Sequence, residues 1–175
     1  MNQVIDQATS QATKNEVDSL LIRAHAYAAL FALLIAVTFG IIISLQFIYP
    51  NFTAEWLPGW GRMRYAHTQG IMLGWLGNAF LAFMYHAVPV LSGRPVTSRR
   101  LGLWLFGVWN FAVMIPGWIL VLSGFSQPLE WAEFPIVVDV FVIVGLALAA
   151  FQFLPPFIRR GVTDLYVSSW YLIGG

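Results

Sequence analysis

Cysteine is absent from this sequence. Its absence excludes thiolate metal sites, a disulfide framework and the Cys-x-x-Cys-His attachment of c-type haem within the chain. Charged residues are also scarce, at 10% of the 175 residues, whereas a soluble domain has about 25%. The chain is instead 59% hydrophobic, and its apolar residues form long runs rather than short alternating segments. These features predict an all-α protein that spans a membrane, since helices satisfy their own backbone polar groups in lipid.

Four apolar stretches reach the roughly 20 residues that a transmembrane helix requires. They run over Leu20–Tyr49, Ala66–Leu91, Leu101–Gly124 and Phe134–Ile158. Turn-forming segments rich in proline and glycine separate them. The sequence therefore predicts a polytopic helix bundle over residues 20–175, preceded by a polar tail over residues 1–19.

The chain closes with "LYVSSWYLIGG", which follows Asp164 and reads as the opening half of a fifth span. Half a span leaves its last carbonyl groups unsatisfied in lipid, which is costly. We therefore expect this chain to be the front part of a longer protein, or a split gene product whose partner completes the bundle.

The basic residues are distributed unevenly between the two sides of the membrane. Seven are predicted on one side: Lys14, Arg23, Arg94, Arg99, Arg100, Arg159 and Arg160. The other side has two, Arg62 and Arg64, together with Trp56, Trp60 and Trp131 as an aromatic belt. Cytoplasmic loops carry the excess of Lys and Arg, so the N-terminus is predicted to lie in the cytoplasm.

His67 stands at the outer mouth of the second span, above a glycine-rich face. Gly70, Gly74, Gly77 and Asn78 share this face if the helix advances 100° per residue. Glycine costs about 1 kcal/mol relative to alanine in a helix, which favours a role for these positions. One role is to let a porphyrin ligated by His67 lie against the backbone, and the alternative is close packing of helices.

Arg64 lies one turn nearer the outer water than His67, and Arg62 is expected further out, in the loop. Guanidinium groups form paired hydrogen bonds to carboxylates, so haem propionates would compensate these two charges. Snorkelling of both side chains to lipid headgroups is the alternative.

The other two histidines are less informative. His86 follows His67 by 19 residues, or about 28 Å of helix, so the two cannot share one iron. His25 and His86 both belong near the cytoplasmic side, where pairing as ligands is conceivable and an interfacial position is the simpler alternative. A second ligand for His67 would have to come from outside this chain.

Three carboxylates near the outer side are further candidates. Asp139 lies inside the fourth span, where an acid is either functional or hydrogen-bonded to a neighbouring helix. Glu130 and Glu133 have a spacing that would let them bind a hard cation, and a solvated loop is the alternative.

Three segments together resemble one protein family. The run "GRMRYAHTQG" resembles the segment entering the second helix of the catalytic subunit of cbb3-type cytochrome c oxidases, in the haem-copper oxidase superfamily. "SGFSQPLEWAEFPIVVD" resembles the outer loop and following helix of that subunit, and "DLYVSSWYLIGG" resembles the entry to its fifth helix. The resemblance covers roughly Gly59 to Gly175, and the nitric oxide reductase large subunit shares the architecture.

The resemblance implies specific roles. His67 would be an axial ligand of the low-spin haem b, with Arg62 and Arg64 near haem propionates. Glu130 and Glu133 would lie near the high-spin haem, where this class binds calcium. The implied partners are the remaining helices of subunit I, other oxidase subunits with c-type haem, a cytochrome c donor and the lipid bilayer of the inner membrane, and no nucleic acid is implied.

The remaining family ligands belong to later helices that this chain lacks: the second low-spin ligand, the high-spin haem ligand, the copper histidines and the cross-linked tyrosine. We therefore assign no catalytic residue and expect the chain to be inactive alone. The leading hypothesis is the N-terminal portion of a proton-translocating cytochrome c oxidase subunit I. The alternatives are a fragment of a nitric oxide reductase and a cofactor-free structural or assembly protein with four spans.

Overall fold

The computed structural model describes residues 17–50, 58–160 and 165–174, and every regular element in these residues is a helix. Four helices in this part of the chain are long and apolar enough to cross a membrane. The elements are α2 (Ser19–Ile48), α3 (Trp60–Gln69), η1 (Gly70–Gly77), α4 (Asn78–Ser92), α5 (Arg99–Gly107), η2 (Val108–Met114), α6 (Ile115–Leu122), α7 (Ile136–Arg160) and α8 (Val167–Gly174). Here η1 and η2 are π-helical stretches, so α3–η1–α4 and α5–η2–α6 are each one continuous membrane helix.

The predicted all-helical bundle with four spans is confirmed, and the boundaries differ in one informative place. The second membrane helix begins at Trp60, with the extended residue Gly59 before it, and not near Ala66. Arg62 was expected in a loop, but it lies in α3, on the same helix as Arg64 and His67. Lys14, Trp56 and most of the N-terminal tail lie outside the described residues.

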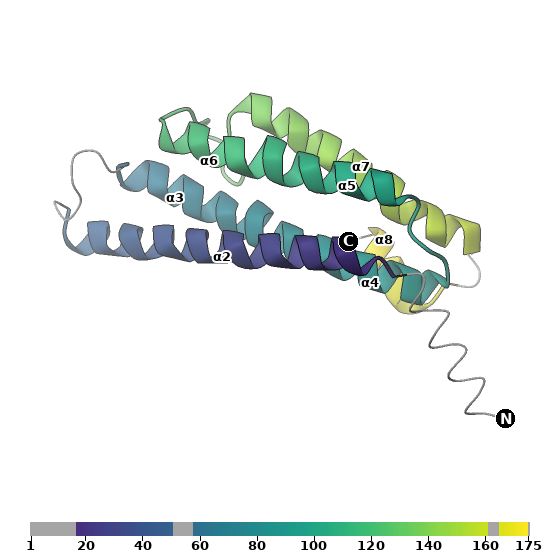
Figure 1. Ribbon diagram of the computed structural model, residues 1–175. Coiled ribbons are helices and arrows are strands. Elements are labelled where there is room, and N and C mark those ends of the chain that lie inside the picture. Colours follow the sequence, from purple (N-terminus) through teal and green to yellow (C-terminus); the bar gives the residue numbers. More distant parts are fainter. Residues whose placement is uncertain (1–16, 51–57, 161–164, 175) are drawn as a thin grey trace.

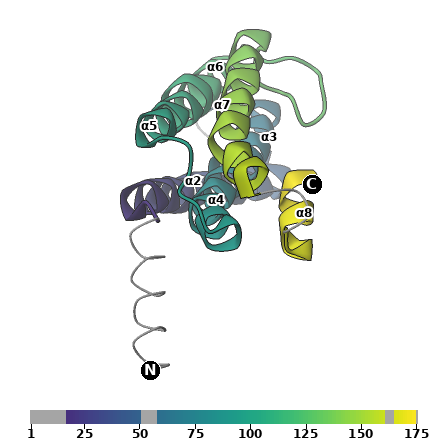
Figure 2. The ribbon, with the colours of Figure 1, turned by 90° about the vertical axis from the view of Figure 1, so that its right-hand side faces the viewer.

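The four membrane helices run side by side, and α8 crosses one end of the bundle (Figure 1). Viewed along their length, α2 and α4 lie on one side while α5, α6 and α7 lie on the other, with α8 beside α4 (Figure 2). Many large apolar side chains on α2 and α7 remain exposed in this bundle, as expected for surfaces that face lipid or further helices.

Small residues bring α2 and the second membrane helix close together. A Cβ atom on Gly70 would lie 2.9 Å from the Cβ of Ala36, and one on Gly74 would lie 2.9 Å from the Cβ of Ala32. Ala32, Ala36 and Gly40 follow one another at four-residue intervals along α2, so they form one stripe on that helix. This is the close approach that small residues permit in membrane helices.

The two π-helical stretches lie against each other in the middle of the bundle, and tryptophan side chains link them to their neighbours. The indole N–H of Trp109 in η2 donates to the carbonyl oxygen of Leu73 in η1 at 2.9 Å. That of Trp118 in α6 donates to the carbonyl of Ala66 at 2.9 Å. A π-helical turn loosens the regular hydrogen-bond ladder, and these indole groups bond to carbonyls within and just before such a stretch.

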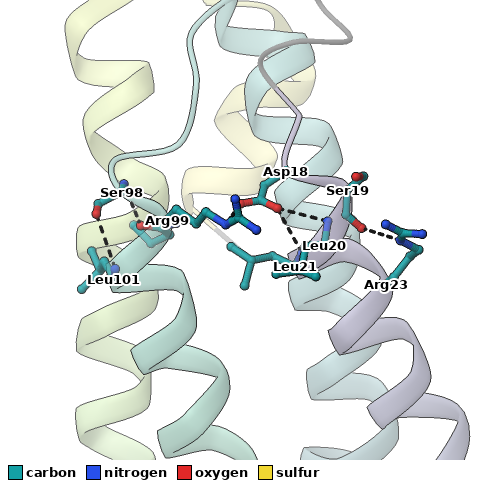
Figure 3. Close-up of polar contacts among 9 residues, drawn as sticks. Asp18, Ser19, Leu20, Leu21, Arg23, Ser98, Arg99 and Leu101 are labelled. Atoms are coloured by element: carbon teal, nitrogen blue, oxygen red, sulfur yellow. Dashed lines mark hydrogen bonds and ion pairs between the residues drawn. The ribbon is translucent and has the colours of Figure 1, made fainter.

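Polar contacts gather at the end of the bundle where α2 begins (Figure 3). Asp18 caps α2 by accepting hydrogen bonds from the N–H groups of Leu20 at 3.1 Å and Leu21 at 3.3 Å. Its carboxylate also pairs with the guanidinium of Arg99 in α5 at 3.4 Å. Arg160, at the end of α7, donates to the carbonyl of Leu91 near the end of α4. This end therefore gathers several of the basic residues that were predicted to share one side.

Packing around Gly117 in α6 gives a test of this arrangement. A Cβ atom on Gly117 would overlap the ring of Phe134, which is fully buried, whereas one on Gly107 would meet no described heavy atom within 4 Å. We expect Gly117→Ala to lower stability by about 1–3 kcal/mol, as overpacking does. Gly107→Ala is the matched control and should be neutral or slightly stabilising. Thermal unfolding of the detergent-solubilised chain measures both, and equal behaviour of the two variants would contradict the packing.

Candidate functional site

His67 lies in α3, half-buried against the small-residue stripe of α2. Its Nδ1 atom is 2.7 Å from the carbonyl oxygen of Ala36. The Cε1 atom of the ring is 2.9 Å from the point that a Cβ on Gly40 would occupy. Any larger residue at position 40 would therefore push the imidazole away, so Gly40 provides the space for this ring.

The hydrogen bond to Ala36 defines the chemistry available at His67. A carbonyl oxygen only accepts, so Nδ1 must carry the proton and donate it. In the neutral ring the lone pair then lies on Nε2, which is the usual arrangement of a metal-ligating histidine. The backbone of α2 thus fixes the tautomer of the neutral imidazole and the orientation of its ring.

A groove of about 440 Å³ lies beside this ring and is lined mainly by α2. The lining residues are Val37, Gly40, Ile41, Ser44, Leu45 and His67. The hydroxyl of Ser44 donates to the carbonyl of Gly40 at 2.9 Å, so it is engaged with its own helix. The groove is therefore an apolar wall next to one imidazole, open on the remaining side.

Gly70 and Gly74 were predicted to give clearance for a porphyrin, and in the structure they pack against neighbouring helices. Gly70 faces Ala36 and the ring of Trp118, while Gly74 faces Ala32 and the side chain of Met114. Close helix packing, the alternative considered for these glycines, describes both positions. The clearance beside His67 comes from Gly40 on the opposite helix, which the sequence analysis had not singled out.

The two arginines of α3 make contacts away from the imidazole of His67. Arg64 places its guanidinium over the ring of Tyr65 at 4.8 Å and that of Trp60 at 5.8 Å. Arg62 is exposed and reaches across to Gly124, with Nη2 2.9 Å from the point that a Cβ there would occupy. Contact of either arginine with haem propionates stays a prediction.

The acidic candidates occupy different environments. Glu133 is buried and accepts a hydrogen bond from the Nε2 of Gln69 in α3, whereas Glu130 is exposed. The described residues contain no group of three or more histidine or acidic side chains that could hold a metal ion, and binding of calcium by Glu130 and Glu133 stays a prediction. Asp139 accepts a hydrogen bond from Gln127 in the α6–α7 loop, so its partner is a loop and not a neighbouring helix.

His25 lies in a polar network that the sequence analysis did not find. It was expected near the membrane interface, but it is fully buried, with Nδ1 2.8 Å from the Oδ1 of Asn78. Asn78 in turn exchanges hydrogen bonds with Asn110 at 3.0 and 3.1 Å. His86 is exposed, so the structure does not present it and the buried His25 as paired ligands. Two asparagines in adjacent apolar spans were the sequence signal for this network.

The buried pair of Gln69 and Glu133 yields a second test. Gln69→Met removes the donor and leaves a buried carboxylate without this partner, so we expect a loss of about 1–3 kcal/mol in stability. In the control, Gln69→Met combined with Glu133→Met makes both partners apolar and should recover much of that loss. Unfolding in detergent measures both variants. A single variant as stable as the wild type would contradict the role of this pair.

Known proteins match the chain over the same helices. Residues 21–175 match the family model described as cytochrome c and quinol oxidase polypeptide I. The chain is 27% identical over 165 residues to cytochrome c oxidase subunit 1 of Rhodobacter capsulatus, covering 92% of this chain and 31% of that protein. It is 26% identical over 134 residues to the cbb3-type cytochrome c oxidase subunit CcoN1 of Stutzerimonas stutzeri, covering 75% of this chain and 28% of that protein.

A third relative, the bacteroid cytochrome c oxidase subunit 1 homolog of Bradyrhizobium diazoefficiens, is 28% identical over 137 residues, which are 77% of this chain and 24% of that protein. The chain thus spans about a third or less of the length of these relatives. Because the family model matches almost all of the chain, including every membrane helix described above, the chain belongs to the cytochrome c and quinol oxidase polypeptide I family.

Proposed function

We propose that this chain forms the N-terminal portion of subunit I of a cbb3-type terminal oxidase, and that His67 is an axial ligand of its low-spin haem b. The subunit would act in an oxidase complex of the inner membrane, with the N-terminus in the cytoplasm. Cytochrome c and subunits carrying c-type haem would deliver the electrons. The relatives named above are cytochrome c oxidases, which favours oxygen over nitric oxide as the final acceptor.

The hydrogen bond from His67 Nδ1 to the carbonyl of Ala36 carries this proposal. It leaves Nε2 as the lone-pair atom, the state in which imidazole binds iron. Such a bond from the second ring nitrogen also fixes ring orientation and raises ligand basicity. The glycine opposite gives the ring room against α2, and the groove beside it leaves one side open for a bound group.

The residues of α2 fit one face of a haem site. Val37, Gly40, Ile41 and Leu45 offer an apolar surface at the level of the imidazole, and a low dielectric around a haem tunes its potential. When bound, the haem supplies one-electron redox chemistry through its iron. The protein's part would be to orient His67 and to line one side of the haem with these apolar side chains.

Substitution of His67 tests the ligand assignment directly. In the complete oxidase complex containing this chain, His67→Ala should abolish the low-spin b-type signal in a reduced-minus-oxidised spectrum. The matched control is His86→Ala, because His86 is exposed and should leave the signal unchanged. A low-spin signal that survives in the His67→Ala complex would contradict the assignment of His67 as ligand. A wild-type complex that contains no haem would instead favour a structural protein.

Gly40 offers an independent test of the geometry. Gly40→Val would place methyl groups where the imidazole now lies, since even a Cβ there comes within 2.9 Å of Cε1. We expect loss or a strong shift of the low-spin signal in the same complex. Gly107→Val serves as the control, because no described atom lies within 4 Å of a Cβ at Gly107. An unchanged spectrum for Gly40→Val would show that the ring does not depend on this contact.

A further inference from the structure

We propose that a hollow at the end of the bundle where α2 and α5 begin binds the headgroup of an anionic phospholipid, with Arg23 and Arg99 as the anion-binding groups. The hollow has a volume of about 510 Å³ and is lined by residues 17–20, Pro95 and Val96 together with the two arginines. This inference depends neither on the haem proposal nor on which side of the membrane is the cytoplasm.

The hollow lies at the depth of the lipid headgroups. The first span begins at Ser19 and the third begins at Arg99. The ion pair of 3.4 Å between Asp18 and Arg99 brings these two starting points together. Polar headgroups lie directly outside the hydrocarbon core that such spans cross. A phosphate group of the surrounding lipid can therefore reach the hollow without leaving the bilayer.

Both arginines have hydrogen-bond donors to spare. Arg23 donates from its Nε to the carbonyl of Ser19 at 3.1 Å, and Nε is also the Arg99 atom that faces Asp18 (Figure 3). Both side chains are exposed, and neither donates a hydrogen bond from its Nη groups to any residue that the structure describes. A guanidinium group has five N–H donors, so the Nη groups are available to phosphate oxygens, which they suit in geometry and charge.

The charge of the hollow is complementary to an anion. Asp18 is the one acid among the lining residues. Its Oδ1 accepts from the N–H groups of Leu20 and Leu21, and its Oδ2 faces Arg99. Both carboxylate oxygens are thus engaged within the protein, and the positive charge of Arg23 remains unbalanced. Basic pockets between membrane helices bind anionic headgroups, whereas a zwitterionic headgroup carries its own cation and gains less from this charge.

Exposed apolar side chains continue from the hollow into the membrane. Tyr27 follows Arg23 by four residues on α2, and Leu103 follows Arg99 by four residues on α5. Residues at this spacing share a helix face, and both Tyr27 and Leu103 are exposed. Each arginine therefore has an apolar side chain one turn deeper, where an acyl chain would lie, which favours a phospholipid over free phosphate.

Native mass spectrometry of the full chain in detergent tests this proposal. Phosphatidylglycerol and phosphatidylcholine with the same acyl chains are added in separate titrations. The wild type should bind one phosphatidylglycerol molecule several-fold more tightly than phosphatidylcholine. Equal binding of the two lipids would overturn the proposal and would favour an acidic protein segment as the occupant.

Charge-removing variants test the location of the site. Arg23→Gln and Arg99→Gln should each weaken phosphatidylglycerol binding about fivefold. Arg159→Gln is the matched control, because Arg159 is an exposed arginine at the end of α7 and does not line the hollow. It should leave binding unchanged. An equal loss in all three variants would overturn the proposal and would indicate general attraction between headgroups and snorkelling arginines.

Asp18→Asn is expected to increase affinity, so its effect cannot be mistaken for a loss of folding. Asparagine caps a helix about as well as aspartate, and the substitution removes the one negative charge that lines the hollow. Phosphatidylglycerol binding should tighten several-fold, and unchanged or weaker binding would overturn this site.

Competition with inorganic phosphate separates the two sources of a phosphate group. Phosphate at the same concentration as phosphatidylglycerol should not displace the lipid, since it lacks acyl chains. Displacement would overturn the assignment to a phospholipid.

Discussion

The close approach of α2 to the second membrane helix is the constraint on which the rest of the structure depends. Ala32, Ala36 and Gly40 on α2 face Gly74, Gly70 and His67 on the other helix. In lipid, helices associate through packing and polar contacts and not through the hydrophobic effect, so small residues on both sides are what allow contact. The same approach brings the carbonyl of Ala36 within hydrogen-bonding reach of His67.

Much of this architecture follows from sequence, because hydropathy and the 20-residue length of a span are strong signals. The position of His67 at the start of the second span was also enough to select it as the leading candidate. The role of Gly40 could not be predicted in this way. A helix periodicity identifies which residues share a face of their own helix, and it does not say which face of a distant helix lies opposite. The contact between Gly40 and His67 is therefore visible only in the tertiary structure.

The polar network around His25 was missed for a related reason. Single polar residues in apolar spans are individually ambiguous, and His25, Asn78 and Asn110 belong to three different membrane helices. Only the assembled bundle shows that these side chains form hydrogen bonds with one another. Besides the Gln69–Glu133 pair, the described helices thus carry two polar centres that contact α2. One lies at His67 in α3, and the other lies further along the same membrane helix at Asn78 in α4.

The π-helical stretch η1 separates these two centres. A π-turn accommodates one residue more than an α-helical turn, and each residue of an α-helix rotates the following side chains by about 100°. An extra residue in a regular α-helix would therefore rotate Asn78 by about 100° relative to His67, and one of the two would lose its partner on α2. The widened turn between Gly70 and Gly77 takes up such a residue without this rotation. The imidazole at one end and the amide at the other thus stay directed at a single neighbouring helix.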